Sequence, residues 1–352
     1  KLDGSYGEGG GQVLRQSVAL AYLMSVPIEI EKIRAGRKTT GLRKQHLVGI
    51  ELISELCNGT LTGNFVKSNS LKFIPNTVKN RKRNEFVADT QTAGSCTLLC
   101  QISLPCVLFA PSCTKLILRG GTNVEWSPTF NYFKLIFLPV LHKMLPTDYF
   151  GNLTVECKRQ GFFPRGGGEL VINVFSVLQH LNPIVLMKKG KLKNIQIVVT
   201  TNSKSSVETT IEKLKLHIVK EFNTEVIVEY SVEKYRSNSS VIFVKIEYEN
   251  TMMGVSQIID KKHKPRIDNI VEDIHKIIDN DGCVDEHLQD QLIIYMALAK
   301  GKSQIRCNDL ELHTTTAIHF AEIMTNASFN IIKEGNTNVI ECIGIGYENK
   351  YI

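Results

Sequence analysis

The chain has 352 residues, of which 43 % are apolar and 22 % are charged, and its formal net charge is +7. This apolar fraction supports a folded core and excludes an intrinsically disordered chain, and such a length typically divides into about two domains. No window approaches the roughly 18 uninterrupted apolar residues of a transmembrane helix. The positive charge favours an anionic partner without requiring one.

The N-terminal residues and the cysteines indicate the cellular environment. Lys1–Gly11 is polar and rich in glycine, so we expect no secretory signal there. The nine cysteines form no C-x-x-C pair, which predicts a reducing compartment and cysteines that act as small buried apolar residues. Cys96 and Cys100 lie four positions apart, but no further ligands accompany them, so they do not predict a metal site.

Hydrophobic periodicity alternates between helical and strand spacing from the start of the chain. Asn58-Gly59 is expected to end the second helix in a left-handed conformation. The predicted elements of this first unit are a helix at Gly11–Met24, a strand at Pro27–Ile33, a helix at Leu42–Cys57, and strands at Thr60–Val66 and Leu71–Pro75.

The same order of elements returns in the next hundred residues, which indicates an internal repeat. Thr92 or Ser95 is expected to cap the first helix of this second unit. The predicted elements are a strand at Phe86–Asp89, a helix at Thr92–Phe109, a strand at Lys115–Arg119, a helix at Phe130–Met144, and strands at Leu153–Cys157 and Glu169–Phe175.

The C-terminal part predicts a third, partial copy of this β-α-β-α-β-β unit. Its elements are helices at Leu288–Ala299 and Thr314–Thr325 and strands at Gln304–Cys307, Phe329–Lys333 and Val339–Ile343. Residues 181–279 differ, being richer in Lys, Glu, Ser and Asn. Their predicted elements are strands at Ile195–Thr200, Val226–Val232 and Val241–Glu247 and helices at Val207–Phe222 and Arg266–Ile278.

The sequence therefore predicts an α/β (α+β) fold with one domain inserted into another. The large domain comprises residues 1–180 and 280–352 and contains the three repeated units. Residues 181–279 form the smaller inserted α/β domain. Two basic runs, Lys188-Lys189 and Lys261–Lys264, lie within this insert or at its edge, and solvated loops are the simplest interpretation of both.

A glycine-rich segment, G-E-G-G-G at residues 7–11, lies directly before the first predicted helix. Glycines there let backbone N–H groups face an anion at the positive helix end, although a tight turn would also need them. The embedded Glu8 favours a ligand site, because a carboxylate beside phosphate needs a divalent cation between them. Glu8 is thus a candidate metal ligand next to a nucleotide, and Arg15 would project toward the same loop.

Five basic residues lie among positions 34–44, across a strand-to-helix turn. A solvated basic loop is one interpretation of this cluster. A phosphate clamp is the other, since the planar fork of an arginine matches phosphoryl oxygens. Further glycine turns at residues 92–95, 119–123 and 164–169 stand at matching unit boundaries. If these turns gather on one face, that face suits a polyanionic substrate.

His313 stands before a predicted helix whose first turn holds three threonines. A helix N-terminus disfavours the imidazolium ion, so this ring should stay neutral and nucleophilic near pH 7. A surface or capping residue is the plain alternative for a lone histidine. His319 lies six positions later, and this spacing does not place both rings on one helical face for a metal.

In these motifs the sequence resembles the RNA 3′-terminal phosphate cyclases over nearly its full length. The matching segments, in chain order, are D-G-S-Y-G-E-G-G-G-Q, I-R-A-G-R-x-x-x-G-L-x-x-Q-H-L, T-A-G-S, R-G-G-T-N, G-F-F-P-R-G-G-G-E, E-H-L-Q-D-Q-L and L-H-T-T-T-A-I-H-F-A-E. The last segment is most similar to eukaryotic members. The resemblance implies a large domain of three units with a small insert, in agreement with the repeat.

Members of this family use ATP to convert an RNA 3′-terminal phosphate into a 2′,3′-cyclic phosphodiester. The resemblance implies that His313 attacks the α-phosphorus of ATP through its tele nitrogen, expels pyrophosphate and carries the adenylate. The adenylate would pass to the RNA, giving RNA-3′-pp-5′-A, and the 2′-hydroxyl would then expel AMP. A phosphate monoester has no good leaving group before activation, so a covalent histidine divides a difficult reaction into easier steps.

The resemblance assigns roles to further residues. Glu8 corresponds to the glutamate that contacts the divalent cation, Mg²⁺ or Mn²⁺. The residues that contact phosphate or RNA would be Arg15, Arg34, Arg37 and Gln45. The ATP-binding residues would be Gln101, Pro128, Tyr132, His287, Asp290 and Gln291. Thr40 replaces a usual proline, which loosens that turn, and His287 replaces a common tyrosine, which keeps adenine stacking in weaker form.

Two other classes of protein remain as alternatives. Non-catalytic cyclase-like proteins of ribosomal RNA processing share the fold but lack the nucleophilic histidine and the intact G-E-G-G-G loop. Enolpyruvyl transferases have a related fold and require neither a histidine at a helix start nor an arginine-rich turn.

The resemblance to eukaryotic members predicts that the protein resides in the nucleus (nucleoplasm), with the cytoplasm as second choice. Lys79–Arg83 is either a nuclear signal or a solvated loop. The sequence leaves homodimerisation open.

Overall fold

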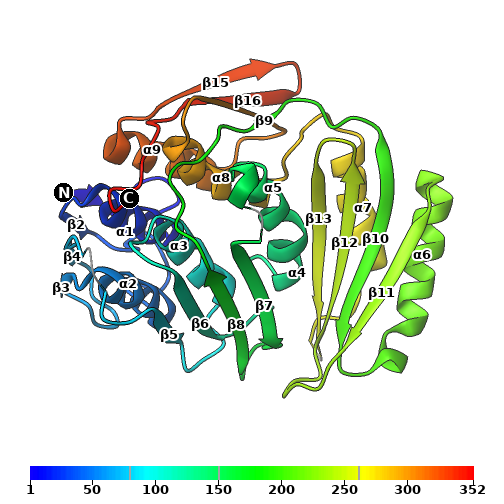
Figure 1. The fold of residues 1–352 in the computed structure, drawn as a ribbon. Coiled ribbons are helices and arrows are strands. Elements are labelled where there is room, and N and C mark those ends of the chain that lie inside the picture. The colour runs from blue at the N-terminus through cyan, green and yellow to red at the C-terminus, as the bar shows by residue number, and fades with distance from the viewer. Residues whose placement is uncertain (79–80, 150, 261) are drawn as a thin grey trace.

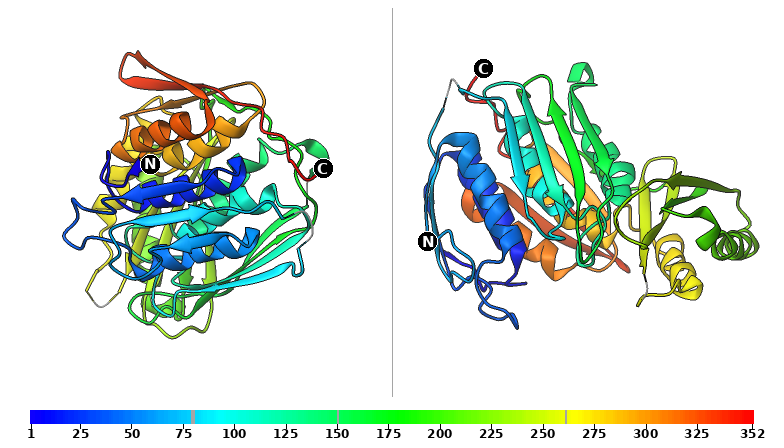
Figure 2. Two further views of the ribbon diagram at one scale, coloured as in Figure 1. Left: turned by 90° about the vertical axis from the view of Figure 1, so that its left-hand side faces the viewer. Right: turned by 90° about the horizontal axis from the view of Figure 1, so that it is seen from below.

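A computed structural model describes residues 1–78, 81–149, 151–260 and 262–352. Within these ranges the chain is a mixed α/β protein with four four-stranded sheets (Figure 1). Three sheets and most of the helices form a main body, and the fourth sheet projects from it together with α6 and α7 (Figure 2). Within these residues, no helix has both the length and the apolar character needed to cross a membrane.

The first sheet has the strand order β1-β2-β4-β3, and its helices connect β1 to β2 and β2 to β3. β1 and β2 are parallel, whereas β4 runs antiparallel to both β2 and β3. The elements of this unit are β1 (Leu2–Asp3), α1 (Gly11–Met24), β2 (Ile28–Glu31), α2 (Lys44–Cys57), β3 (Thr60–Thr62) and β4 (Leu71–Ile74).

The second sheet, β5-β6-β8-β7, repeats this arrangement. β5 and β6 are parallel, and β8 is antiparallel to both β6 and β7. The strands and the first helix of this unit are β5 (Glu85–Asp89), α3 (Cys96–Leu108), β6 (Thr114–Gly120), β7 (Leu153–Arg159) and β8 (Gly168–Val174). Between β6 and β7 lie α4 (Phe130–Tyr132), the π-helical turn η1 (Phe133–Phe137), α5 (Leu138–His142) and η2 (Thr147–Tyr149).

The third sheet, β9-β14-β16-β15, has the same pattern of one parallel and two antiparallel pairings. Its elements are β9 (Val185–Leu186), α8 (Glu286–Leu298), β14 (Lys302–Cys307), α9 (Leu312–Thr325), β15 (Ser328–Glu334) and β16 (Thr337–Ile343). The segment between β9 and α8 forms the fourth sheet. β9 itself pairs with β14, so the third sheet already begins within the range 181–279 that the sequence predicts as the insert.

The fourth sheet, β11-β10-β12-β13, is covered by α6 and α7 on one face. Alternate residues of its central strand β12 belong to two cores: Ile242 and Val244 pack with the helices, whereas Val241 and Phe243 pack with the main body. Its elements are β10 (Leu192–Thr201), η3 (Lys204–Ser206), α6 (Glu208–Phe222), β11 (Val226–Val232), β12 (Ser240–Tyr248), β13 (Met252–Ile259) and α7 (Ile267–Ile278). This sheet is therefore buried on both faces.

Several predicted boundaries need correction. The continuous helix expected at Phe130–Met144 is interrupted by η1, because Pro139 has no N–H to donate to the preceding turn. The strand expected at Thr60–Val66 stops at Thr62, where Gly63 turns the backbone to φ +83°. The helix expected from Thr92 begins at Cys96, and Ser95 is its cap, accepting a hydrogen bond from Leu98 N at 3.2 Å.

The cysteines and the end of α2 agree with the predictions. All nine cysteines are free thiols, and seven of them are buried. Cys96 and Cys100 are both fully buried in the core, as expected of small apolar residues. Asn58 caps α2 in the left-handed conformation, at φ 49°.

Two basic runs lie partly outside the described residues. In Lys79–Arg83, the predicted nuclear signal or solvated loop, residues 79 and 80 are not described; Arg83 pairs with Glu55 at 2.5 Å and lies over the Phe86 ring. In Lys261–Lys264, residue 261 is not described, and His263 lies 3.0 Å from Asp260.

The packing of α6 generates a prediction about stability. Ile211 is fully buried against the fourth sheet, whereas Leu216 on the same helix is 67 % exposed. Ile211→Ala should lower the free energy of unfolding by about 2–5 kcal/mol, because it leaves a cavity. Leu216→Ala should change it by no more than about 0.5 kcal/mol. Urea unfolding followed by circular dichroism measures both, and equal losses would contradict the assigned packing.

Candidate active site

The N-terminal ends of α1, α2, α3 and α9 gather on one side of the main body. Glu8 N, just before α1, donates to Thr316 Oγ1 on α9 at 3.0 Å. A Cβ atom at Gly11 would lie 2.7 Å from a ring atom of His46 on α2. Ser95 N, at the cap of α3, donates to Gln45 Oε1 at 2.7 Å. Since helix N-termini carry partial positive charge, this face favours anions.

The other glycine turns gather beside these helix ends, as predicted. Gly121 N donates to the carbonyl oxygen of Gly94 at 2.8 Å, and Cys96 N donates to that of Gly121 at the same distance. A Cβ atom at Gly166 would lie 2.3 Å from the carbonyl oxygen of Thr92. Turns from different parts of the second unit therefore pack backbone against backbone.

The glycine loop before α1 is held tightly around Glu8. Gly7 and Gly9 adopt positive φ angles of 59° and 56°, which favour glycine. A Cβ atom at Gly10 would lie 2.1 Å from Glu8 Oε1, and one at Gly7 would lie 2.2 Å from Thr316 Oγ1. The loop therefore needs glycine both to turn and to leave room for the Glu8 carboxylate.

Glu8 forms an ion pair with Arg37, and only 10 % of the glutamate side chain is exposed. Arg37 Nη2 also donates to the backbone carbonyl oxygen of Glu8 at 3.0 Å. The second carboxylate oxygen, Oε2, is buried and makes no hydrogen bond to the described residues. Such an oxygen fits one ligand position of a divalent cation whose other ligands are phosphate and water oxygens.

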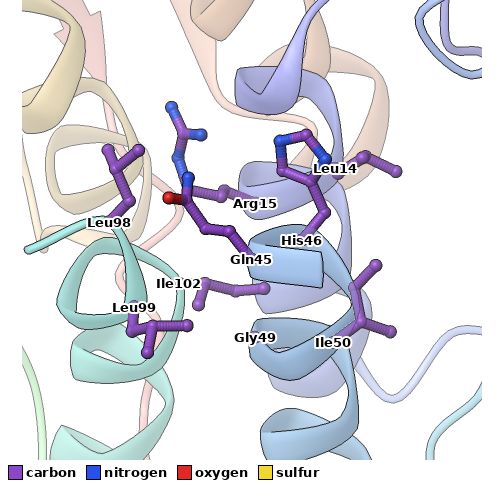
Figure 3. Close-up of a pocket in the computed structure, with 9 residues that line it drawn as sticks. All are labelled: Leu14, Arg15, Gln45, His46, Gly49, Ile50, Leu98, Leu99 and Ile102. Atoms are coloured by element: carbon purple, nitrogen blue, oxygen red, sulfur yellow. The ribbon is translucent and has the colours of Figure 1, made fainter. Parts of the chain in front are cut away.

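Arg15 is held at the mouth of the site by two amides. Its Nε donates to Gln101 Oε1 at 3.0 Å, and its Nη2 donates to Gln12 Oε1 at 2.9 Å. Burial lowers the pKa of Arg15 to about 10, so the guanidinium remains charged at neutral pH. Figure 3 shows Arg15 with Gln45 and His46 at one end of a small pocket whose floor is apolar.

The ring of His46 contributes no charge to this positive region. Its Nδ1 accepts a hydrogen bond from Arg43 N at 3.2 Å. Burial, together with Arg15, Arg34 and Arg43, lowers the pKa of His46 to about 3. His46 is therefore neutral at physiological pH.

His313 and Asp290 influence each other across the site. Burial raises the pKa of Asp290 to about 6, against the opposing effect of nearby cationic groups. Loss of hydration lowers the pKa of His313 below 6.5; Asp290 opposes this, whereas Arg15 and Arg37 reinforce it. His313 is the second residue of α9 rather than the residue before it, with Glu311 at the cap. The ring is thus neutral near pH 7.

A second group of predicted residues forms a wall around the start of α8. The Tyr132 hydroxyl donates to Asp285 Oδ1, and the rings of Tyr132 and His287 meet edge to face, with centroids 5.7 Å apart. Gln291 Nε2 donates to the His287 carbonyl oxygen, while Gln291 Oε1 is buried without a partner among the described residues. Gln291 also lines a cavity of about 30 Å³ with Arg15, Gln101 and Asp290.

The remaining predicted site residues are Arg34, Pro128 and Gln45, and each forms a hydrogen bond within the protein. Arg34 Nη2 donates to the Thr39 carbonyl oxygen at 3.2 Å, within its own turn. The Pro128 carbonyl oxygen accepts a hydrogen bond from Thr97 Oγ1 at 2.7 Å. Gln45 holds Ser95 N, so its side chain positions a turn in this structure.

The sequence analysis missed three residues that organise the site. Thr316 holds the glycine loop, Asp285 caps α8 and holds Tyr132, and Gln12 holds Arg15. An aspartate shortly before the helix predicted at Leu288–Ala299 is a capping signal that could have identified Asp285 and an earlier helix start. The contacts of Thr316 and Gln12 depend on tertiary packing and have no comparable signal.

Comparisons with known proteins identify the family of the chain. A family profile described as RNA 3′-terminal phosphate cyclase matches residues 6–331. The chain is 38 % identical over 368 residues to the probable RNA 3′-terminal phosphate cyclase of Dictyostelium discoideum, covering 99 % of this chain and 83 % of that protein. It is 33 % identical over 368 residues to the RNA 3′-terminal phosphate cyclase of Drosophila melanogaster, covering 100 % and 98 %. The chain belongs to the RNA 3′-terminal phosphate cyclase family.

A solved structure gives a much weaker match. The enolpyruvyl transferase NikO from Streptomyces tendae is aligned over 98 % of this chain and 82 % of its own, with a TM-score of 0.26 and 11 % sequence identity. These values support no conclusion about this chain.

The charges around His313 generate a prediction. Its pKa, measured by NMR titration of histidine ring signals, should lie below 6.5. Asp290→Asn should lower it further, because the substitution removes a negative charge that stabilises the imidazolium ion. His313→Gln identifies the signal by its loss. A higher His313 pKa in Asp290→Asn would contradict the electrostatic contact.

Proposed function

We propose that the chain is an ATP-dependent RNA 3′-terminal phosphate cyclase that releases AMP and diphosphate. The family membership of the full chain supports this activity. The observation that carries the mechanism is a neutral histidine, His313, in the electrostatic field of Asp290, Arg15 and Arg37. The glycine loop lies beside it through Thr316, three residues further along α9.

In the first proposed step, His313 attacks the α-phosphorus of ATP. A nitrogen–phosphorus bond forms, the bond to the bridging oxygen breaks, and pyrophosphate leaves. Arg15 and Arg37 stabilise the negative charge on the phosphates. Asp290 stabilises the positive charge that the imidazole gains, in keeping with its effect on the His313 pKa.

Glu8 is the proposed protein ligand of the divalent cation. A bound cation would neutralise phosphate charge and align the leaving group. Glu8 Oε2 fits this role because it is buried without a hydrogen bond to any residue that the structure describes, whereas Oε1 pairs with Arg37. In this proposal Arg37 pairs with Glu8 and also contacts the phosphates.

The wall formed by Tyr132, His287 and Gln291 is the proposed adenosine site. His287 is exposed beside the edge of Tyr132, so its ring has a face available for adenine. Gln291 Oε1 has no partner in the described parts of the chain and can accept a hydrogen bond from an amino group. Asp285 fixes the Tyr132 hydroxyl, which keeps the wall in place.

The later steps join the adenylate to RNA. An oxygen of the RNA 3′-phosphate attacks the adenylate phosphorus and frees His313, and the 2′-hydroxyl then attacks the terminal RNA phosphorus and expels AMP. Arg34 and Arg37 lie on the basic turn that we assign to phosphate, part of it from RNA. The non-catalytic cyclase-like proteins considered above lack the nucleophilic histidine and the intact loop, whereas this chain has both His313 and G-E-G-G-G.

We also propose that residues 1–180 and 280–352 form one domain of three β-α-β-α-β-β units, with 181–279 inserted into the third. The shared strand order of three sheets supports the repeat. The position of the fourth sheet between β9 and α8 supports the insertion, although β9 itself belongs to the large domain.

Replacing the nucleophile is the first test of this function. His313→Ala should abolish both self-adenylation and cyclisation, because no neighbouring group can replace the imidazole. His319→Ala should retain self-adenylation, since its ring stacks on Tyr6 with centroids 3.9 Å apart. Retention of radioactivity from α-labelled ATP on denatured protein measures the first step. A dead His319 variant together with a labelled His313 variant would overturn the assignment.

Glu8→Gln tests the proposed cation ligand. It should slow self-adenylation about ten- to a hundred-fold, the range expected for loss of one charge-assisted contact, and excess Mg²⁺ should restore part of the rate. Glu55→Gln is the matched control, because it also removes a glutamate paired with an arginine, away from the site. Single-turnover adenylation at several Mg²⁺ concentrations measures both. An unchanged Mg²⁺ dependence in Glu8→Gln would exclude Glu8 as a ligand.

A further inference from the structure

Trp126 is the only tryptophan of the chain, and it is 96 % exposed. Its backbone has φ +62°, a conformation that bulky residues rarely adopt. The ends of this loop are fixed: Asn123 N donates to the Gly161 carbonyl oxygen at 3.0 Å, and Phe130 N donates to Asn123 Oδ1 at 3.2 Å. The fold thus holds a large aromatic ring in water on a constrained loop, which is typical of a binding site.

A second exposed aromatic ring lies on the neighbouring loop. Phe163 is 66 % exposed, although the preceding Phe162 is buried. Phe162 forms a parallel β-bridge with Asn123, which places the two loops side by side. Phe162 also packs on Tyr235, which lies between β11 and β12 of the fourth sheet, with ring centroids 4.9 Å apart. The buried ring anchors the loop, and Phe163 remains available to a ligand.

Three exposed arginines accompany these rings: Arg159, Arg165 and Arg236. Arg159 donates to the Gly167 carbonyl oxygen, and Arg236 Cδ lies 3.7 Å from the position of a Cβ atom at Gly167. Arg165 lies two residues after Phe163 on the same loop. Glu125 precedes Trp126, and its carboxylate lies 3.3 Å from His263 Nε2. We call Trp126, Phe163 and these three arginines the aromatic–arginine platform.

The platform is continuous with the candidate active site. Gly166, beside Arg165, packs against the Thr92 carbonyl oxygen, and the same turn leads to Ser95, whose N–H binds Gln45. Pro128, two residues after Trp126, belongs to the predicted ATP-binding residues. A chain whose end lies near His313 can therefore extend over these turns toward Trp126.

We propose that the aromatic–arginine platform binds single-stranded RNA upstream of its 3′-terminal phosphate. Bases of a single strand expose their faces and stack on aromatic rings with little sequence preference, while arginines contact the phosphates. Paired bases in a duplex do not offer these faces. The placement of the RNA end at His313 rests on the proposed function, whereas binding of the strand to the platform does not.

Trp126 reports on this binding directly, because it is the only tryptophan. A single-stranded 12-mer RNA with a 3′-hydroxyl, added without ATP, should quench the intrinsic fluorescence saturably and protect it from acrylamide. The same RNA in a duplex should do so much less. RNA that binds in a filter assay without affecting Trp126, RNA that does not bind at all, or equal quenching by the duplex would each overturn the proposal.

Substitutions separate stacking from folding. Phe163→Ala and Trp126→Gly should each raise the Kd for the 12-mer about thirty-fold, the middle of the range for one base on one ring. Glycine accepts φ +62°, so Trp126→Gly should keep or raise the melting temperature. Phe175→Ala is the control: Phe175 is 55 % exposed but follows β8 at its far end from Gly168, and its removal should leave the Kd unchanged. Equal Kd values for wild type and both platform variants would refute stacking.

Charge and activity provide independent measurements. Arg165→Gln should reduce the slope of log K against log salt by about 0.7, as for one phosphate contact on a single strand. With 3′-phosphorylated substrates, the platform variants should lose much of the KM advantage of a 12-mer over a dinucleotide. If the wild type cyclises neither RNA yet Trp126 responds to the strand, the proposed function fails and the platform stands. If cyclisation occurs but the variants keep the full length preference, the platform fails.

Discussion

The hydrogen bond from Glu8 N to Thr316 Oγ1 joins residues 308 positions apart, and the arrangement of the site depends on it. It places the candidate cation ligand beside the helix that carries His313. A second, buried hydrogen bond runs from Gln16 Nε2 on α1 to the Ala317 carbonyl oxygen on α9, at 2.6 Å. Because Gly7 leaves just enough room for Thr316, the loop and α9 cannot shift independently. The candidate nucleophile and the glycine loop are therefore positioned by one packed interface between the first and third units.

The same packing brings Arg15, Arg37 and Asp290 close enough to His313 to influence its charge. Loss of hydration, reinforced by Arg15 and Arg37, lowers the pKa of His313 against the opposing effect of Asp290, so the ring stays neutral while a negative partner lies close by. A neutral imidazole can attack phosphorus, and a nearby carboxylate favours the cationic product of that attack. His46, with its pKa lowered to about 3, fills space among the arginines without adding charge. The candidate site concentrates positive charge where phosphate is expected and keeps its candidate nucleophile, His313, uncharged.

The sequence predicts best what local patterns determine. α1 is predicted to the residue because its apolar spacing is uninterrupted, and the glycine loop is recognisable because its function needs both positive φ angles and a small side chain. The two-residue strands β1 and β9 escape prediction because they are defined only by their partners, and β13 escapes because Gly254 interrupts its alternation. The contact between Tyr132 and Asp285 joins residues 153 positions apart, and no local pattern encodes it. The family resemblance supplies site residues for which periodicity gives no signal.

The fourth sheet helps to hold the residues of the candidate adenosine site in position. Gly254 N, on β13, donates to Asp285 Oδ2 at 3.3 Å, while the other oxygen of this carboxylate holds the Tyr132 hydroxyl. Phe243, on β12, meets Tyr132 edge to face with centroids 6.4 Å apart, and a side chain at Gly254 would collide with that phenylalanine ring. The position of Tyr132 is thus set from two sides, by α8 and by the inserted strands. Because Asp285 is buried and bonded to both, displacement of the fourth sheet would leave this carboxylate with fewer hydrogen bonds. This cost couples the insert to the wall proposed to bind adenine, although none of the insert's own residues is predicted to touch ATP.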